Sequence, residues 1–585
     1  MAGSSCPLIS LSGGDIFEAL EKTRRIQGPK TLDLGDGTLS LSQPLMLDAR
    51  DDGLTLTGTA KLTVARSISR WRPEPDGLLS CTVPEGIIPT ELIINGTPRT
   101  LAVYPLAGYL RTLDRCQLHW RNSENGGWDR PPSREDLTCL TLDTASLPNG
   151  FDPAGSLVTV FHQWDESTVE VVSFDSKTGH LQLSSPMEHP SGAFGRNECV
   201  FRGVREGMSV PGVWYWDRKA GRIFYHPLPG ETGISAYLPT VSSPILIRGA
   251  SGVTVSGLTF CFSGALRSRC GLRGSLAPGA IDAEDAQDLI LRGLKIVSPG
   301  GSGIRLCRCS GARVLDCLIE NAGVCGVYAS DCFPAEYRGC RIRDVGRLSG
   351  CAVGIVAGGR SVLQYVLDGR PEESGGVVIA ENEISGSPYC GIALGGGPHL
   401  VEGNVLSNCM RVLRDGAAVY CSRGIGTILR GNTAISCRDN ELSYAWYLDE
   451  WSENCLVEHN LADGFSVPFQ FHRAKHCVIR GNRSRSPEAM TIRATMCRDL
   501  NFRDNTFEAV GNLYLQTNRE ETEPSENSPF HWENNTFFAT SCIQRARIWR
   551  QDGTVTITDM PIDPPEGLSR TEPKPFPPFY LKEES

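Results

Sequence analysis

A short unit that recurs in the second half of the chain constrains the fold more than any other feature of the sequence. Each copy is a short apolar strand, a turn containing Asn and a second short strand, and no helical pattern separates the copies. The copies are VIAENEI (378–384), LVEGNVL (400–406), ILRGNTA (428–434), LVEHNLA (456–462), VIRGNRS (478–484) and FRDNTF (502–507). A single coil of this length cannot bury its own apolar face, so we expect the coils to stack on one another.

The asparagines of these copies mark the period of the repeat. They are Asn382, Asn404, Asn432, Asn460, Asn482 and Asn505. Their spacings are 22, 28, 28, 22 and 23 residues, which predicts an all-β fold, a right-handed parallel β-helix with one coil per repeat. The competing solenoid, a leucine-rich repeat, would need a Leu-x-x-Leu-x-Leu signature that the chain lacks. We expect each Asn to lie at a corner, where it tolerates a left-handed backbone and hydrogen-bonds locally.

The cysteines follow the same register. Cys409 and Cys437 come five residues after an Asn of the repeat, and Cys455 and Cys477 come five residues before one. The chain has 22 Cys among 585 residues, a low density for a disulfide scaffold, so we expect reduced, buried side chains. The close pair Cys307 and Cys309 lacks zinc-site spacing, and no metal or cofactor is expected.

The repeat divides the chain into four regions. Residues 1–72 contain an amphipathic helix at about Asp15 to Ile26, expected to cover the open end of the solenoid, and the first coils. Residues 73–240 carry irregularly spaced strand-like runs broken by Gly, Pro and Asn, which predict an inserted β-sandwich-like domain. Residues 241–545 are the β-helix that carries the active site, and residues 546–585 are a Pro-rich tail.

Charge and hydropathy argue against several classes of partner. The chain has 57 basic and 67 acidic residues and a net charge of −10 at pH 7, whereas a nucleic-acid binder normally carries a basic patch. Residues 1–12 lack the features of a secretory signal, and no apolar run reaches the roughly 18 residues that span a bilayer. We therefore expect a cytoplasmic protein without nucleic-acid or membrane partners. Exposed coil edges leave room for a homo-oligomer.

Two wide coils contain the acidic candidates. The 28-residue spacings lie between Asn404 and Asn460, and additional residues in a solenoid coil form loops on one face, where ligands usually bind. Asp415 precedes the strand GAAVY, and Asp449 ends the strand AWYLD with Glu450 directly after it. These carboxylates are the candidate catalytic groups.

The period-two alternation of a strand predicts which side chains accompany them. If Trp446 and Leu448 point into the core, their neighbours point outward. Aligning PFQFHR (468–473) with WYLDE adds two outward residues from the next coil. The predicted outward patch, able to hydrogen-bond a sugar, is Tyr447, Asp449, Gln470 and His472. Trp451 would add a stacking surface.

Four segments of the chain resemble β-helical glycoside hydrolases, the group that includes β-helix-type β-xylosidases and α-L-fucosidases on a pectin-lyase-like scaffold. Those similar to the inserted domain and the active coils of that group are INGTPRTLAVYP (94–105), PGVWYWDRKAGRIFYHP (211–227), GIALGGGPHLVEGNVLSNCMRVLRDGAAVYCSRG (391–424) and AWYLDEWSENCLVEHNL (445–461). The likeness spans about residues 31 to 540. Val103 departs from the pattern of the group, in which a basic residue is common at this position.

The resemblance implies a pair of catalytic carboxylates and places His399 near the cleft. Glycoside cleavage needs one carboxyl group that protonates the departing oxygen and a second that attacks the anomeric carbon or activates water. We assign Asp415 as nucleophile or base and Asp449 as acid, with Glu450 as the rival acid. In the loop between Asp415 and Asp449, Asp439 and Glu441 stay open as alternatives for either of these two roles.

The leading hypothesis is therefore a glycosidase that removes a non-reducing terminal sugar from an oligosaccharide, in the manner of a xylosidase or fucosidase. Because the two carboxylates come from adjacent coils, a short separation and retention of configuration are slightly favoured. Two alternatives stay open. A polysaccharide lyase on the same scaffold would need a basic proton acceptor and often Ca²⁺, and a non-catalytic solenoid would only bind carbohydrate.

Overall fold

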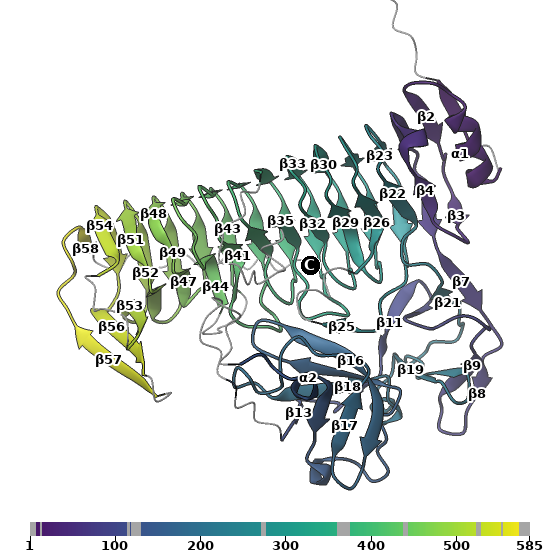
Figure 1. Ribbon diagram of the computed structural model, residues 1–585, viewed down its shortest axis with the longest axis horizontal. Helices are drawn as coiled ribbons and strands as arrows, with labels where there is room; N and C mark the ends of the chain where they lie inside the picture. The colour runs from purple at the N-terminus through teal and green to yellow at the C-terminus, as the bar shows by residue number, and fades with distance from the viewer. Residues whose placement is uncertain are drawn as a thin grey trace, which may run out of the picture.

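The chain winds into a long solenoid built from three parallel sheets of 14 strands each (Figure 1). The computed structural model describes residues 7–11, 14–113, 118, 130–270, 277–359, 375–436, 443–521, 528–550 and 554–571. Sheet I runs from β1 (Leu8–Ser10) to β54 (Phe530–Glu533), and sheet II runs from β3 (Thr38–Ser40) to β58 (Leu568–Arg570). Sheet III runs from β4 (Leu45–Leu47) to β57 (Val555–Pro561). The predicted all-β fold and stacked coils are confirmed.

Sheet III positions the candidate site. Between its two end strands its order is β22 (Ile245–Arg248), β26 (Gly279–Glu284), β29 (Ser302–Cys307), β32 (Val327–Ser330), β35 (Ile355–Gly358), β38 (Ile392–Gly395), β41 (Gly416–Ser422), β44 (Ser443–Asp449), β47 (Val467–His472), β50 (Met490–Thr495), β53 (Leu513–Glu520) and β56 (Cys542–Trp549). Every neighbouring pair is parallel except β56 with β57. Equivalent residues of successive coils therefore lie directly above one another.

The core of the solenoid is a set of apolar ladders made by this register. One ladder of sheet III comprises Ile245, Ile281, Ile304, Val327, Ile355, Ile392, Val419, Trp446, Phe469, Ile492 and Leu515. Each of these side chains is at most 4% exposed. Burial of one such side chain contributes about 1.5–3 kcal/mol, so the coils share a single continuous core.

The asparagines form a buried hydrogen-bond ladder rather than the left-handed corners we expected. The backbone N–H and the side-chain amide of Asn404 both donate to Oδ1 of Asn432, at 3.0 and 2.9 Å. Asn432 makes the same pair of bonds to Asn460, and each amide also donates to a carbonyl of the preceding coil. The left-handed residue is the one before each Asn, such as Gly403 with a φ of 65°. The Asn side chains do form hydrogen bonds, as predicted, but these bonds join one coil to the next instead of groups close in the sequence.

The helix α1 (Ile16–Arg24) covers one end of the solenoid, as predicted. The Asp15 side chain accepts a hydrogen bond from the N–H of Phe17 and caps the helix, while Ile16, Ala19 and Leu20 are buried in the solenoid core. In the part of the chain that the structure describes, no helix is long and apolar enough to cross a membrane.

The chain leaves the solenoid after β6 (Lys61–Thr63) and returns at β22. Between them, the strands from β7 (Ala65–Ile68) to β21 (Ala236–Pro239) form most of two further sheets. The hydrophobic cluster of one sheet includes Val158 and Val169, and that of the other includes Trp214. The insert is rich in strands, and it begins with β7, within residues 1–72 that we assigned to the first coils, rather than at residue 73.

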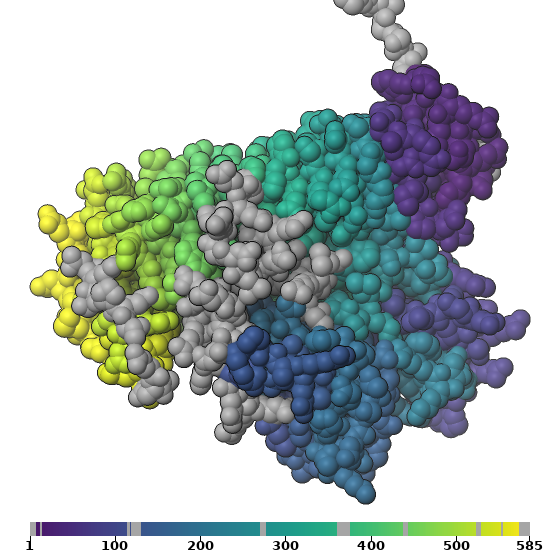
Figure 2. Space-filling model, in the orientation of Figure 1, coloured from purple at the N-terminus to yellow at the C-terminus, as the bar shows by residue number. Residues whose placement is uncertain are grey.

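The insert packs against one side of the solenoid (Figures 1 and 2). Strand β25 (Arg269–Cys270) extends from the solenoid and pairs antiparallel with β16 (Glu166–Asp175) of the insert. The Glu166 carboxylate, 3% exposed, accepts a hydrogen bond from the N–H of Gly350 at 2.8 Å. Buried contacts of this kind fix the position of the insert relative to the coils.

The segment expected to be a tail begins within strand β56. Strand β57 turns back antiparallel on β56, and β58 pairs with β55 (Asn535–Phe538) in sheet II. Strand pairing therefore extends beyond residue 545. The final segment, residues 572–585, lies outside the described residues.

The described cysteines agree with the expectation of free thiols. Cys455 and Cys477 are free and buried, while the half-buried Cys409 donates a hydrogen bond to the carbonyl of Ser407. Cys437 lies outside the described residues. The Cys455 thiol donates to the carbonyl of Gly424 at 3.0 Å, so it packs as a small, hydrogen-bonded group.

The Asn ladder predicts a large stability cost for Asn432→Ala. This change removes the acceptor used by two N–H groups of Asn404 and both bonds donated by the Asn432 amide. We expect the free energy of unfolding to fall by about 3 kcal/mol, since buried donors and acceptors lose their partners. Urea unfolding followed by circular dichroism measures the change, with Thr433→Ala on the solvent side as the control. Equal stability of the two variants would contradict the ladder.

Candidate functional site

The outward face of sheet III carries the predicted polar residues. Trp446 pairs with Phe469 inside the core, and Tyr447 pairs with Gln470 on the outer face. His472 follows Phe471 at the end of β47 and hydrogen-bonds Asp449 at the end of β44. The strand alternation therefore places these side chains as the sequence predicts.

Asp449 is held by two hydrogen bonds from neighbouring strands. Its Oδ1 lies 2.9 Å from Nδ1 of His472, and its Oδ2 accepts a hydrogen bond of 2.7 Å from the hydroxyl of Tyr420. Burial opposes ionisation of this carboxyl, which is 9% exposed, but the bonds from His472 and Tyr420 and the charge of His472 lower its pKa below the ordinary value. Asp449 is thus built to stay ionised.

His472 is the electrostatic partner of Asp449. Burial disfavours the charged imidazolium, whereas the hydrogen bond and charge of Asp449, with a further contribution from Glu450, raise the His472 pKa. The result is a close ion pair on the outer face of the sheet.

Asp415 lies at the start of β41 and has a left-handed φ of 60°. Its Oδ2 accepts a hydrogen bond of 3.3 Å from the side-chain amide of Gln163, which comes from the insert. Its backbone carbonyl accepts a bond of 2.9 Å from the Tyr389 hydroxyl. Burial and then the negative charge of Asp449 raise the Asp415 pKa to about 6, so this carboxyl holds its proton in mildly acidic solution.

The two carboxylates approach the site from opposite ends of adjacent strands. Gly416, directly after Asp415, pairs with Ser443 at the start of β44, whereas Asp449 pairs with Ser422 at the end of β41. The side chains therefore do not stack directly above one another, as two residues on adjacent rungs would. They are nevertheless electrostatically coupled, because the charge of Asp449 contributes to the raised pKa of Asp415.

An aromatic floor lies on the outer face of these strands. Tyr447 meets Tyr420 and Tyr444 edge to face, with ring centroids 5.2 and 5.1 Å apart. Arg493 of β50 donates a hydrogen bond of 3.2 Å to the Tyr444 hydroxyl and also lowers the pKa of Asp415 electrostatically, against the larger raising effects. Tyr444 and Tyr447 are 1% and 4% exposed, whereas Tyr420 is half-buried. Tyr420 is therefore the ring of this group that a sugar, with its apolar and hydroxyl-bearing sides, could reach.

The remaining candidates are Gln470, Glu450 and Trp451, which differ in their exposure and in what their side chains contact. Gln470 is 5% exposed; its amide donates to the Phe471 carbonyl at 3.3 Å, and its Oε1 has no hydrogen-bond partner in the described structure. Glu450 is 6% exposed in the turn after β44. Trp451 is half-buried, with the guanidinium groups of Arg423 and Arg473 at 5.1 and 5.8 Å from its ring centroid. Trp451 therefore already takes part in cation–π contacts.

His399 is not placed in the patch. It is 2% exposed, its Nε2 lies 3.1 Å from the carbonyl of Gly395, and its Nδ1 accepts from the N–H of Val377 at 3.4 Å. Burial lowers its pKa to about 4. Its Nε2 therefore faces the end of β38 and its Nδ1 faces the start of β36 (Val377–Ala380), so both ring nitrogens are engaged with backbone groups, and contact of His399 with substrate stays a prediction.

The alternatives Asp439 and Glu441 lie outside the described residues. Within the described ranges, no group of three or more His, Cys, Asp or Glu side chains is arranged to hold a metal ion.

Several members of the site were not found from the sequence. Tyr420 could have been found by applying the alternation of β44 to β41, since the two strands are in register. Gln163 gave no local signal, because it lies 252 residues from Asp415 in the sequence. Tyr444 of β44 and Arg493 of β50 meet across the intervening strand β47 through their long side chains.

Comparison with known proteins agrees with this architecture. Residues 241–366 and 372–541 match the family described as the right handed beta helix region, and the chain belongs to this family. A search of curated proteins by sequence gives no match.

Solved structures extend the comparison beyond the family region. One described as a glycoside hydrolase has a TM-score of 0.63 at 15% identity and covers 80% of this chain and 95% of its own. The complex of XylC with xylose has a TM-score of 0.43 at 10% identity, with 88% and 79% of the two chains covered. The tailspike gp61 of Pseudomonas phage phi297 has a TM-score of 0.34 at 10% identity, with 88% and 74% covered. The first of these shows a shared fold.

The raised pKa of Asp415 predicts a pH-dependent effect of Asp415→Asn on stability. In the unfolded chain this carboxyl ionises near 3.8, and in the folded protein it ionises near 6. The folded state therefore loses stability relative to the unfolded state as the pH rises through this window, and the Asn variant does not share the loss. We expect the Tm of Asp415→Asn minus that of the wild type to increase between about pH 4 and pH 7, measured by calorimetry. The exposed change Asp36→Asn, in the turn before β3, is the control, and a difference independent of pH would contradict the burial of Asp415.

Proposed function

We propose that the protein is a glycoside hydrolase acting on an oligosaccharide. The observation that carries this proposal is a pair of coupled carboxyl groups, Asp415 and Asp449, whose environments move their pKa values in opposite directions. Pairs of this kind divide into an acid and a base in glycosidases. The sequence resemblance to β-helical glycoside hydrolases supports the same reaction class.

The pKa values favour a division of roles opposite to our sequence-based assignment. Asp415, protonated up to about pH 6, is the proposed general acid that protonates the departing glycosidic oxygen. Asp449, kept ionised by Tyr420 and His472, is the proposed nucleophile or base, which attacks the anomeric carbon or activates water. Sequence alone could not order the two, because the order depends on burial and on hydrogen bonds between coils.

The insert supports action on a chain end. Gln163 follows β15 (Leu157–Phe161) and reaches Asp415, and the Gln163 carbonyl accepts a hydrogen bond of 3.0 Å from the N–H of Arg414. The insert therefore closes one side of the site at the proposed acid. A blocked side suits a pocket for a terminal sugar more than a groove open at both ends, so we propose an exo-acting enzyme.

A panel of aryl glycosides of xylose, fucose, galactose and arabinose tests this function. We expect hydrolysis of at least one, and Asp449→Asn to lower kcat by at least about 10³-fold, since the chemical step loses its nucleophile or base. Proton NMR of the first product gives the stereochemistry. Asp36→Asn, in an exposed turn of the first coils, is the matched control. Full activity of Asp449→Asn would remove the basis of the proposal.

A second test separates the two roles. If Asp415 is the acid, Asp415→Asn should retain activity on a dinitrophenyl glycoside, whose leaving group needs no proton, and lose activity on the corresponding methyl glycoside. The wild-type kcat/KM on the methyl glycoside should fall about tenfold per pH unit above pH 6, as Asp415 loses its proton. Equal losses on both substrates would return Asp415 to the role of nucleophile or base.

A polysaccharide lyase is the second candidate, favoured by the hydrogen bond between Arg493 and the Tyr444 hydroxyl beside Asp415. The arginine could neutralise a uronate carboxylate, whereas burial raises the Tyr444 pKa, so the proton acceptor of a lyase would have to be a different group. Ultraviolet absorbance of an unsaturated uronide product, with no activity on the aryl glycosides, would favour the lyase.

A further inference from the structure

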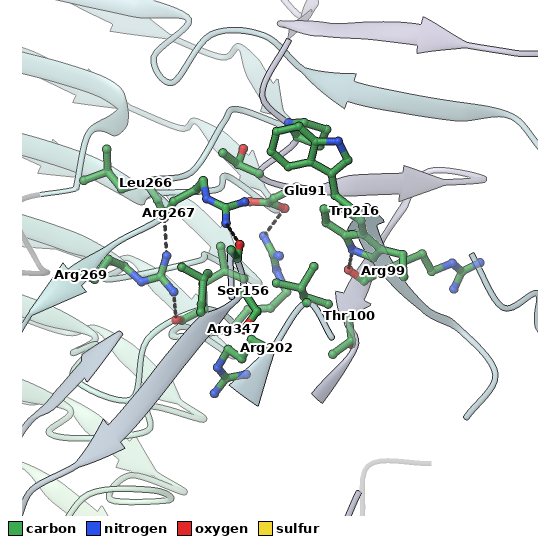
Figure 3. Close-up of a pocket in the computed structure, with 18 residues that line it drawn as sticks. Glu91, Arg99, Thr100, Ser156, Arg202, Trp216, Leu266, Arg267, Arg269 and Arg347 are labelled. Atoms are coloured by element: carbon green, nitrogen blue, oxygen red, sulfur yellow. Dashed lines mark hydrogen bonds and ion pairs between the residues drawn. The ribbon is translucent and has the colours of Figure 1, made fainter. Parts of the chain in front are cut away.

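A second cleft lies where the insert meets the solenoid, and its lining is rich in arginine (Figure 3). Its arginines are Arg99, Arg202, Arg267, Arg269 and Arg347. Glu91 is the one carboxylate among the lining residues, all of which the structure describes. The cleft encloses about 70 Å³, which is enough for a few water molecules or one small oxyanion. This local excess of positive charge contrasts with the net charge of −10 of the whole chain.

Three of the arginines define the middle of the cleft. In Figure 3, Arg267 and Arg347 lie beside Glu91, Arg269 lies close to them, and the guanidinium groups of Arg99 and Arg202 point away. Arg347 pairs with Oε2 of Glu91 at 2.9 Å. The single negative charge of Glu91 is therefore already engaged by Arg347.

Arg269 is a buried cation whose hydrogen bonds go to backbone carbonyls. It is 8% exposed, and its guanidinium donates to the carbonyls of Leu266 and, at 2.7 Å, Leu348. Its Nε has no hydrogen-bond partner in the described structure. Burial lowers the Arg269 pKa to about 10, although the charges of Glu166 and Glu91 oppose this effect. Burial of a cation is costly, so an anion in the cleft would stabilise it further.

Arg267 is only weakly neutralised. Its Nε lies 3.6 Å from Oε2 of Glu170, but that carboxylate already makes two shorter bonds to Arg218, at 2.6 and 2.8 Å. The remaining polar contact of Arg267 is a bond of 3.3 Å to the carbonyl of Gly155. The guanidinium is held over the ring of Trp216 at 5.7 Å, which orients it at the cleft.

The two arginines are held in place by the fold. Arg269 belongs to β25, whose pairing with β16 fixes its backbone across the junction. Oε1 of Glu91 is not offered to the cleft, because it is buried against Gly300, outside the lining. The cationic donors are thus positioned before any ligand arrives, which lowers the entropic cost of binding.

We propose that this cleft is a binding site for a small oxyanion, a carboxylate or phosphate group, carried by a hydroxylated molecule such as a sugar acid or sugar phosphate. Arg267 and Arg269 bind the anionic oxygens, and the hydroxyl-bearing lining residues Thr100 and Ser156 lie beside the hydroxylated part of the ligand. The site shares none of its lining residues with the pair Asp415 and Asp449, so it is separate from the proposed hydrolase centre and goes beyond that function.

Isothermal titration of the full chain with glucuronate, glucose 6-phosphate and glucose tests the proposal. At least one of the two anions should bind and glucose should not, because it lacks the charged group. Binding of glucuronate alone identifies a carboxylate site, binding of glucose 6-phosphate alone identifies a phosphate site, and binding of both identifies a general oxyanion site. The proposal would be overturned if neither anion bound, or if glucose bound with the same affinity as the anions.

Variants locate the binding. Arg267→Met and Arg269→Met should each weaken the affinity at least about tenfold, the size expected for one lost charged hydrogen bond. The exposed Arg292→Met is the matched control and should change the affinity less than twofold. Asp449→Asn should also leave it unchanged, which separates this cleft from the hydrolase site. Unchanged affinity in a folded Arg267→Met protein, or loss in Asp449→Asn, would contradict the assignment.

Competition in the wild-type protein covers the case in which the arginine variants do not fold. Inorganic phosphate should displace the bound sugar anion, since both would occupy the same arginines. If neither inorganic phosphate nor high salt weakens the binding of the sugar anion, the cleft is not an oxyanion site.

Discussion

The in-register pairing of parallel strands is the constraint on which the rest of the structure depends. Because side chains alternate with a period of two, a slip of one residue between coils would exchange the core and the surface of a whole strand. The ladder through Val419, Trp446 and Phe469 keeps sheet III in register from inside, and the Asn ladder does the same at a corner. The side chains of the outer face are fixed by the same register, which brings Asp449 to 2.9 Å from His472 on the next coil.

The sequence was informative wherever the structure is local and periodic. The Asn spacing predicted the solenoid, and the amphipathic pattern predicted α1. The strand alternation predicted the inward position of Trp446 and the outward positions of Tyr447 and His472. These features follow from side-chain spacing along one strand or helix, and spacing can be read without knowing the neighbours.

The rest depends on contacts that spacing does not encode. The Gln163 bond to Asp415 joins the insert to a distant coil, and the ionisation order of Asp415 and Asp449 reflects burial and cross-strand bonds. The Asn residues illustrate the same limit. Their position was predicted, but their partners are the Asn residues of neighbouring coils, whereas the left-handed backbone belongs to the residue before each one.

The detour of the chain through the insert has a consequence for how the solenoid assembles. The first coils precede the insert, yet β5 (Leu54–Thr57) finds its next partner in β23 (Thr254–Ser256), with Thr55 opposite Thr254. During synthesis the early strands keep an open edge until some two hundred residues more have been made. Since closing so long a loop is slow compared with pairing coils about 22 residues apart, the downstream coils are the natural nucleus and the amino-terminal end is added last.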